Sequence, residues 1–282
     1  MAFAARTFPT IEINGTFYSL QSPALFGRWA EETPDDFVFA LKGPRYVTHM
    51  LKLKDTKPAL ANFFASGLLR LERKLGPILW QLPPTLAFDA ERLAAFFALL
   101  PRDTDAAARL ARAHNDKLKA KAWLRTRENR RLRHALEVRH ESFKTRAFIG
   151  LLRKYDIALV CADTVEWPLL MDVTSDFVYC RLHGSEELYA SGYNDNALAI
   201  WANRIGAWAG GGDAEGPHAG KGRAPRRKSR DVYVYFDNDA MVRAPFDAGN
   251  LIQKLEPPSR PRPARRIGAQ DDPSRTDSSA RR

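Results

Sequence analysis

The sequence contains few cysteines and no long hydrophobic run. Cys161 and Cys180 are the only cysteines among 282 residues, and each stands inside an apolar run. Two cysteines cannot form a disulfide framework or a cysteine-based zinc site, so we expect a reducing compartment, the cytoplasm. The longest apolar run, residues 93–100, is far shorter than the roughly 20 residues that span a bilayer. No secretory signal precedes it, and we expect no membrane partner.

Patterns that bind a metal are absent as well. No His-x-Glu pair and no two histidines one helical turn apart occur. A two-metal centre usually has more carboxylates and histidines than cations. We therefore expect neither a catalytic metal nor a cofactor.

The net charge of +11 is concentrated in three segments. Residues 102–133 carry +7, residues 209–230 carry +4 and residues 257–282 carry +4, which leaves −4 for the rest of the chain. A connecting segment, a loop and a tail thus hold the excess. We interpret it as solvated surface rather than as a nucleic-acid footprint.

Short β-rich runs alternate with helical patterns, which is typical of βα units around a parallel sheet. Helices are predicted at residues 22–29, 59–75 (with Gly76 as the C-terminal cap), 89–100, 148–155 and 197–208. Seven strands are predicted, at residues 11–14, 37–42, 77–82, 134–140, 158–163, 177–184 and 232–239. The fold class is therefore α/β, a TIM-type (β/α)8 barrel.

Such a barrel needs eight strands, so one strand is missing from this list. Residues 1–8 are typical of the last turns of a helix that leads into the first predicted strand. We therefore expect the first strand and most of its helix to lie upstream of Met1. The barrel domain is predicted at residues 1–255, with a basic disordered insertion at about 210–230 and a disordered Arg/Pro-rich tail at 256–282.

Charged residues occur in these strands where a barrel should be apolar on both faces. Because side chains alternate along a strand, each polar set shares one face, and we expect these sets to point into the barrel at its carboxyl-terminal mouth. The predicted members are Glu12, Asn14, Lys42, Gln81, Glu137, Arg139, His140, Asp163, Arg181 and His183.

This set suggests an anionic substrate, because Arg139, Arg181 and Lys42 can together hold a phosphate or a carboxylate. Glu137, His183, Asp163 and Glu12 are the candidate catalytic groups, and the chemistry would be general acid/base catalysis in a hydrolase, lyase or isomerase. Two alternatives remain open. One is a nucleic-acid-binding or nucleic-acid-processing protein that uses the basic loop and tail, and the other is a non-catalytic scaffold with a salt-bridged interior. The oligomeric state stays undetermined.

Short motifs lie in order along the chain at residues 12–18, 39–42, 45–49, 76–84, 137–143, 162–163, 179–184 and 235–239. Together they resemble the motifs of the YecE-like family, domain of unknown function 72, and the resemblance covers residues 3–255. The resemblance implies a TIM-type barrel and adds Arg45, His49 and Asn238 to the candidate substrate-binding residues. It implies no activity, because the family is named for lacking one.

Overall fold

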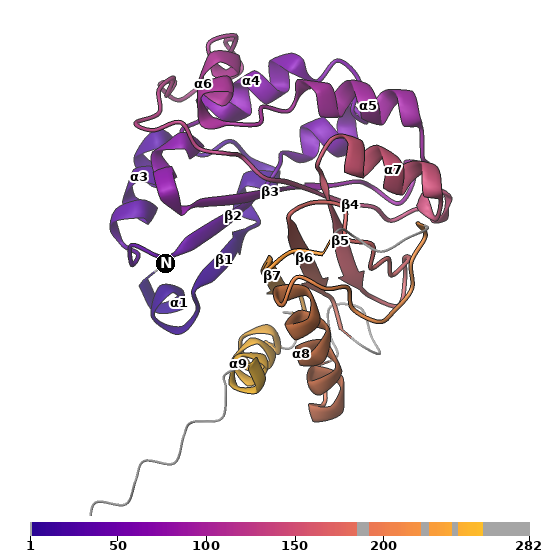
Figure 1. The fold of residues 1–282 in the computed structure, drawn as a ribbon. Coiled ribbons are helices and arrows are strands. Elements are labelled where there is room, and N and C mark those ends of the chain that lie inside the picture. The colour runs from indigo at the N-terminus through magenta and orange to yellow at the C-terminus, as the bar shows by residue number, and fades with distance from the viewer. Residues whose placement is uncertain (1, 185–191, 221–225, 239–241, 256–282) are drawn as a thin grey trace, which may run out of the picture.

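The computed structural model describes residues 2–184, 192–220, 226–238 and 242–255. Figure 1 shows the strands side by side with helices around them. The strands are β1 (Thr10–Ile13), β2 (Val38–Lys42), β3 (Leu75–Gln81), β4 (His134–Glu137), β5 (Ala158–Asp163), β6 (Phe177–Leu182) and β7 (Asp231–Phe236). The helices are α1 (Ala2–Thr7), α2 (Gly15–Tyr18), α3 (Pro23–Glu31), α4 (Lys57–Ala65), α5 (Ala90–Leu99), α6 (Thr104–Ala111), α7 (Arg146–Lys154), α8 (Asp195–Ala209) and α9 (Ala244–Leu255), with helical turns η1 (Tyr46–Met50), η2 (Leu68–Lys74) and η3 (Glu141–Phe143).

The seven strands form one parallel sheet in chain order, each paired with the next. Within the described ranges no backbone pairing joins β1 to β7, but side chains do. The Thr10 hydroxyl of β1 lies 2.8 Å from the Tyr235 hydroxyl of β7. The sheet is therefore a nearly closed, TIM-like barrel of seven strands, which confirms the predicted fold class.

Helices begin where the sequence supplies a capping side chain. The Ser22 hydroxyl accepts from Leu25 N at the start of α3, and Asp89 accepts from Arg92 N at the start of α5. The helices predicted at residues 22–29, 89–100, 148–155 and 197–208 are confirmed as α3, α5, α7 and α8. Helix α6 was not predicted, although Asp103 caps it by accepting from Ala106 N at 2.7 Å.

The predicted continuous helix at residues 59–75 is wrong. Helix α4 ends at Ala65, η2 follows, and Gly76 lies inside strand β3 rather than capping a helix. The break occurs at Gly67, whose φ of 114° no ordinary helical residue adopts. A Cβ at Gly67 would lie 2.4 Å from Pro23 Cα, so this close approach of α3 requires glycine.

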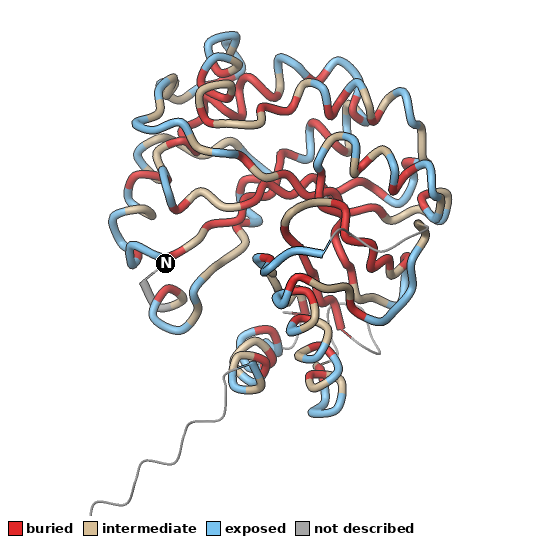
Figure 2. Tube along the Cα trace, viewed as in Figure 1, coloured by how far each residue is buried: buried red, intermediate tan, exposed pale blue. Residues whose placement is uncertain are grey.

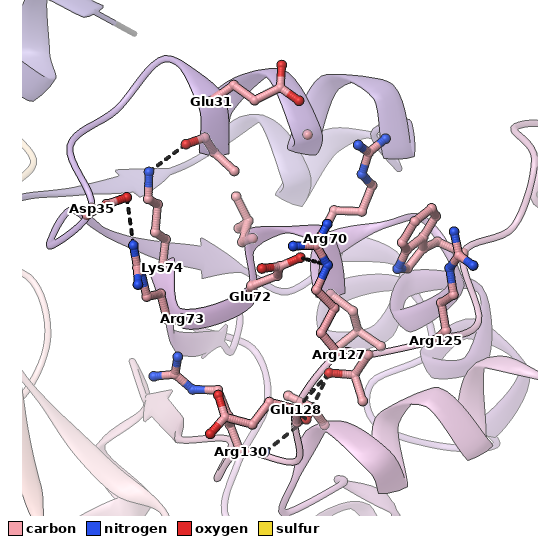
Figure 3. Close-up of a pocket in the computed structure, with 17 residues that line it drawn as sticks. Glu31, Asp35, Arg70, Glu72, Arg73, Lys74, Arg125, Arg127, Glu128 and Arg130 are labelled. Carbon is pink, nitrogen blue, oxygen red and sulfur yellow. Dashed lines mark hydrogen bonds and ion pairs between the residues drawn. The ribbon is translucent and has the colours of Figure 1, made fainter.

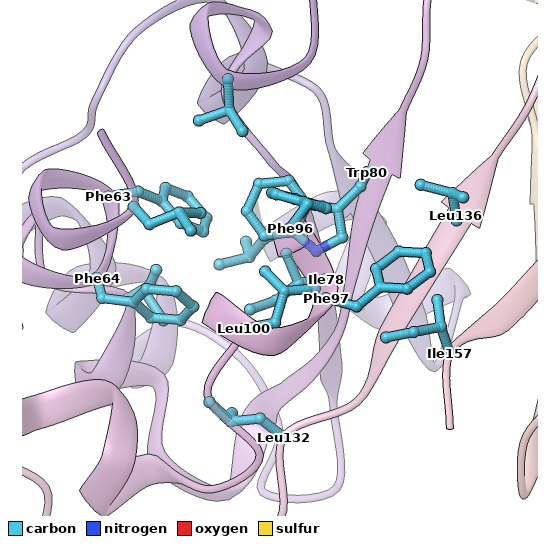
Figure 4. Packing of buried hydrophobic residues seen from close by; sticks show 14 of the residues in the cluster. Phe63, Phe64, Ile78, Trp80, Phe96, Phe97, Leu100, Leu132, Leu136 and Ile157 are labelled. Atoms are coloured by element: carbon cyan, nitrogen blue, oxygen red, sulfur yellow. The ribbon is translucent and has the colours of Figure 1, made fainter. Parts of the chain in front are cut away.

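The outer face of the sheet is covered by an aromatic core (Figure 4), and Figure 2 shows that the strands are largely buried. The Trp80 ring of β3 lies 5.3 Å from the Phe96 ring of α5 and 5.9 Å from the Phe63 ring of α4. Trp80 also donates its indole N–H to His134 of β4. Burying each such ring contributes about 1.5–3 kcal/mol, so this layer fixes α4 and α5 on the sheet.

Inside the barrel, small and large side chains face each other. Ala40, Ala135 and Ala158 come from β2, β4 and β5, whereas Tyr179 and Tyr235 come from β6 and β7. This apolar layer closes the middle of the barrel. Two residues further along β2, β4, β6 and β7, the inward positions are polar, which places polar groups at the carboxyl ends of these strands, whereas the inward positions of β5 stay apolar.

The described parts of the segment at 210–230 contact the barrel. Asp172 accepts from Ala219 N at 2.8 Å and from Gly220 N at 2.9 Å, and Ala214 is buried. The hydrophobic pattern did not indicate these contacts. Residues 221–225 and the predicted tail at 256–282 lie outside the described residues.

Candidate functional site

Arg181 lies at the centre of a set of buried ion pairs, called here the Arg181 network: Arg181, Glu12, Glu137 and Asp237. The Arg181 Nη1 atom lies 2.8 Å from Glu137 Oε2 of β4, and Nη2 lies 3.0 Å from Glu12 Oε1 of β1 and 2.7 Å from Asp237 Oδ2. The side chains of Arg181 and Glu137 are fully buried. One guanidinium from β6 thus joins β1, β4 and the end of β7.

The network keeps the carboxylates of Glu137 and Asp237 ionised. Burial alone would raise the pKa of Glu137, but Arg181 and Arg139 hold that pKa well below its ordinary value. Burial would likewise raise the pKa of Asp237, whereas its hydrogen bond with His183 and the charge of Arg181 lower it. Burial and Glu12 raise the pKa of Tyr179, which donates its hydroxyl to Glu12 Oε2 at 2.6 Å.

His183 lies against the network and is covered by an aromatic ring. Its Nδ1 atom lies 3.2 Å from Asp237 Oδ2, and its Nε2 atom lies 3.5 Å from Arg181 Nη1. The Trp167 ring packs edge-on against the imidazole at 5.4 Å. A carboxylate that contacts one ring nitrogen orients the imidazole, as in the Asp–His pairs of acid/base sites.

Arg139 follows strand β4 and contacts both the network and Trp167. Its Nε atom donates to Glu137 Oε1 at 2.8 Å, and its guanidinium lies 4.1 Å from the centre of the Trp167 ring. Gln81 donates to the same Glu137 oxygen. The two Nη groups of Arg139 make no hydrogen bond to any described residue, so they remain available to a ligand.

Lys42 ends strand β2 as a buried cation. Its side chain forms no ion pair with any residue that the structure describes, and its Nζ atom lies 4.4 Å from the centre of the Phe17 ring. Burial and the charge of Arg181 lower the pKa of Lys42. The three carboxylates of the network are each paired with arginine, which leaves Lys42 without an ion-pair partner in the described part of the chain.

His49 and Arg45 lie at the edge of this positive region. Burial, then the charges of Arg139, Lys42 and Arg45, lower the pKa of His49 to about 4, so its imidazole is neutral at pH 7. Its Nδ1 atom lies 2.9 Å from the Thr48 hydroxyl. Arg45 is exposed and has no ion-pair partner among the residues placed by the structure.

Four candidate residues are not brought together with the network. Asp163 was expected to point inward, but it accepts from the Trp201 indole N–H on the outer face of β5. Asn238 likewise faces outward and donates to Asp247 of α9. Strand β4 ends at Glu137, so His140 lies beyond it and accepts from Ser142 N. Asn14 follows β1 and is exposed.

The prediction that Asp163 and Asn238 point into the barrel is wrong, because the alternation of side chains along β5 and β7 places both on the outward face. In β5 the inward residues are Ala158, Val160 and Ala162, so Asp163 must face the helices. In β7 the inward positions are Tyr233 and Tyr235, and Asp237 follows them on the same face while Asn238 does not. Sequence reasoning therefore missed Asp237, although the alternation in β7 contained the signal.

Among the described residues, no group of three or more His, Cys, Asp or Glu side chains is placed to hold a metal ion. The same residues include no helix that is long and apolar enough to cross a membrane. Most of the polar side chains at the mouth instead carry guanidinium, ammonium or carboxylate groups. Such groups suit recognition of an anion and proton transfer.

A separate cavity of about 810 Å³ lies at the other end of the barrel, beside the amino ends of β2, β3 and β4 (Figure 3). Two of the five arginines that line it are paired with acids: Arg73 with Asp35 at 2.7 Å and Arg127 with Glu72 at 3.0 Å. Lys74 is buried and donates to the carbonyl of Thr33. Barrel enzymes place their chemistry at the carboxyl ends of the strands, so the Arg181 network is the better candidate site.

Solved structures show a similar fold. A DUF72 family protein from Thermotoga maritima superimposes with a TM-score of 0.65 at 22% identity, over 90% of this chain and 86% of that one. A DUF72 family protein from Enterococcus faecalis V583 gives a TM-score of 0.64 at 16% identity, over 90% and 87% of the two chains. At these identities the likeness concerns the fold alone.

Sequence comparisons identify the same family as the ordered motifs. The protein UPF0759 YecE of Escherichia coli K12 is 33% identical over 96 residues, which is 34% of this chain. The match covers about a third of the length of that relative, 34%. The family model described as "Protein of unknown function DUF72" matches residues 1–268, which confirms the resemblance. The chain therefore belongs to the DUF72 family.

Proposed function

We propose that the protein binds an anionic small molecule, such as a phosphate ester or a carboxylate, at the carboxyl mouth of the barrel. The observation that carries the proposal is Lys42, a largely buried residue whose ammonium group has no ion-pair partner among the described residues. A buried charge without a counter-ion is costly, and a bound anion would supply that counter-ion. Arg139 adds two Nη groups that can hold the same anion in a bidentate manner.

Arg181 has a different part in this proposal. Its guanidinium is engaged by Glu12, Glu137 and Asp237, so it positions the site instead of binding the ligand. Glu137 in turn holds Arg139 through the 2.8 Å bond to Nε. The hypothesis of a salt-bridged scaffold is partly retained in this assignment, because the ion pairs that arrange the mouth also stabilise the barrel.

His183 is the proposed general acid or base. Its imidazole is oriented by Asp237, whereas Glu137 is ionised at neutral pH and paired with two arginines. Trp167 covers the imidazole, so a substrate reaches His183 when Trp167 moves aside. Chemistry at this group would be proton transfer to or from a substrate whose charge is held by Lys42 and Arg139.

The test is ligand-induced thermal stabilisation with inorganic phosphate and phosphate monoesters as probes. Saturating anion should raise the Tm of the native protein, since a ligand at about 100 times its Kd adds roughly 2.7 kcal/mol of stability. Lys42→Met and Arg139→Met should each remove most of this rise. Lys144→Met, which changes a half-exposed lysine paired with Glu141, is the matched control and should respond as the native protein does.

Two outcomes would overturn the proposal. One is a native protein whose Tm none of these anions raises. The other is stabilisation that survives unchanged in the Lys42→Met, Arg139→Met double variant, because the anion would then bind elsewhere.

A further inference from the structure

A groove of about 780 Å³ lies beside the mouth, at the loops that follow β1 and β2. We call it the Tyr46 groove. Eight large hydrophobic side chains are substantially exposed in the described part of the chain, and three of them line this groove: Tyr18 (70% exposed), Tyr46 (40%) and Met50 (64%). Single exposed hydrophobic residues are ordinary, but a cluster of them around a hollow marks a binding surface.

The backbone around the groove has an unusual conformation. Tyr46–Met50 forms a π-helical turn, and Lys52, Leu53 and Asp55 follow with φ angles of 48°, 65° and 49°. π-helical turns and left-handed non-glycine residues cost energy and occur preferentially at functional sites. Leu53 is buried, so packing holds this segment in place. The strained segment presents Tyr46 and Met50 to the groove.

The groove adjoins the proposed anion site, and the Phe17 side chain lies between them. The Phe17 ring lines the groove, contacts the Tyr18 ring at 5.1 Å and the His49 ring at 5.1 Å, and lies 4.4 Å from Lys42 Nζ. The groove and the cation at the mouth thus share one side chain. A ligand with two parts could reach both.

The charged groups at the groove are mainly positive. Arg45 and Lys117 line it, and the Lys117 ammonium lies 5.9 Å from the centre of the Tyr46 ring. Among the described residues, Asp55 is the one acid that lines the groove. Aromatic rings and cations at one hollow favour a planar, electron-rich ring that carries negative charge.

We infer that the anionic ligand carries a planar aromatic or heteroaromatic ring, and that this ring occupies the Tyr46 groove while the anion contacts Lys42 and Arg139. The inference rests on the proposed function. The volume of the groove falls within the roughly 300–1,000 Å³ of small-molecule sites. The ligand class is therefore a ring-bearing phosphate, of which a nucleoside monophosphate is an example.

The test compares adenosine monophosphate with ribose 5-phosphate by titration calorimetry, because the two probes share the ribose phosphate and differ in having adenine or a hydroxyl group at the anomeric carbon. Adenosine monophosphate should bind about tenfold more tightly to the native protein. The Tyr46→Ala, Met50→Ala double variant should abolish this difference and leave the affinity for ribose 5-phosphate unchanged. Phe246→Ala removes a similarly exposed side chain from α9 and should preserve the difference.

The outcomes separate the two proposals. Equal affinities of the two probes, both abolished by Lys42→Met, would overturn the ring site and leave the anion site standing. Binding of neither probe would overturn the anion site itself and the inference with it. A preference for adenosine monophosphate that survives the double variant would also contradict the ring site.

Methyl NMR places the ring directly. The chain has four methionines, and the Met50→Leu variant identifies the Met50 methyl signal. A stacked ring should shift this signal through its ring current when adenosine monophosphate is added, whereas ribose 5-phosphate should not. A methyl signal that does not move with adenosine monophosphate would show that the ring lies elsewhere.

Discussion

Arg181 Nη1 lies 2.8 Å from Glu137 Oε2, and both side chains are fully buried. Ion pairs of this kind are costly to bury, and they hold together only when every charge has a partner. Here one guanidinium pairs with carboxylates on β1, on β4 and directly after β7, and it bridges the opening between β1 and β7. Stability and the arrangement of the candidate site therefore depend on the same residue.

Replacing Arg181 should destabilise the protein strongly. Arg181→Met leaves Glu12, Glu137 and Asp237 without their shared partner, and the free energy of unfolding should fall by about 3–5 kcal/mol. Chemical denaturation measures the change. Arg131→Met breaks ion pairs of a half-exposed arginine and should cost less than about 1 kcal/mol. Similar losses in the two variants would show that burial of the Arg181 network is unimportant.

Acid should destabilise the protein through His134. Burial lowers the pKa of this histidine from 6.5 to about 4, while its ring nitrogens contact Trp80 and the Pro101 carbonyl. Between these two values the unfolded chain binds a proton that the folded chain does not, so stability is present above pH 6.5 and is lost as pH falls. The contribution of His134 to the loss between about pH 7 and pH 5 should be about 2 kcal/mol. Urea denaturation at both values measures it.

The His134→Gln variant is the control for this titration. Glutamine can donate and accept hydrogen bonds without titrating, so the variant should lose less stability than the native protein over the same interval. An unchanged pH dependence would assign the effect to other groups.

Gly67 and Gly150 should respond oppositely to alanine. Gly67→Ala introduces a Cβ 2.4 Å from Pro23 Cα at a φ of 114°, and should cost more than about 1 kcal/mol. Gly150 lies inside α7, and a methyl group added there would meet no neighbouring side chain within 4 Å, so Gly150→Ala should stabilise by about 0.5–1 kcal/mol. Thermal denaturation of both variants is the measurement, and a neutral Gly67→Ala would contradict the close approach of α3.

Asp172 should hold the segment at 210–220 against the barrel. Asp172→Ala removes the acceptor for Ala219 N and Gly220 N, so trypsin should cleave the basic segment at 210–230 about tenfold faster. Asp105→Ala, which changes an acid in the first turn of α6, is the control and should leave the rate unchanged. Equal cleavage rates in the two variants would show that these hydrogen bonds do not restrain the segment.

The sequence by itself determined the class of fold. Seven apolar runs with intervening helical patterns define the strands, and capping residues such as Ser22 and Asp89 define where helices begin, because both signals depend on neighbours in the chain. Alternation along β4 and β6 also placed Glu137, Arg181 and His183 on inward faces. These properties are local, because they follow from the repeat of side-chain directions, every two residues in a strand and every 3.6 residues in a helix.

The tertiary structure decided which of these groups meet and which have no ion-pair partner among the described residues. Asp163 is of a residue type common in active sites, but its position in the alternation of β5 places it on the outward face. Its hydrogen bond with Trp201 depends on where α8 packs. The break at Gly67 depends on the approach of Pro23, which is distant in sequence. Strand register and barrel closure bring Arg181 into contact with all three carboxylates, and they leave Lys42 with no ion pair in the described part of the chain. No local pattern in the sequence specifies either result.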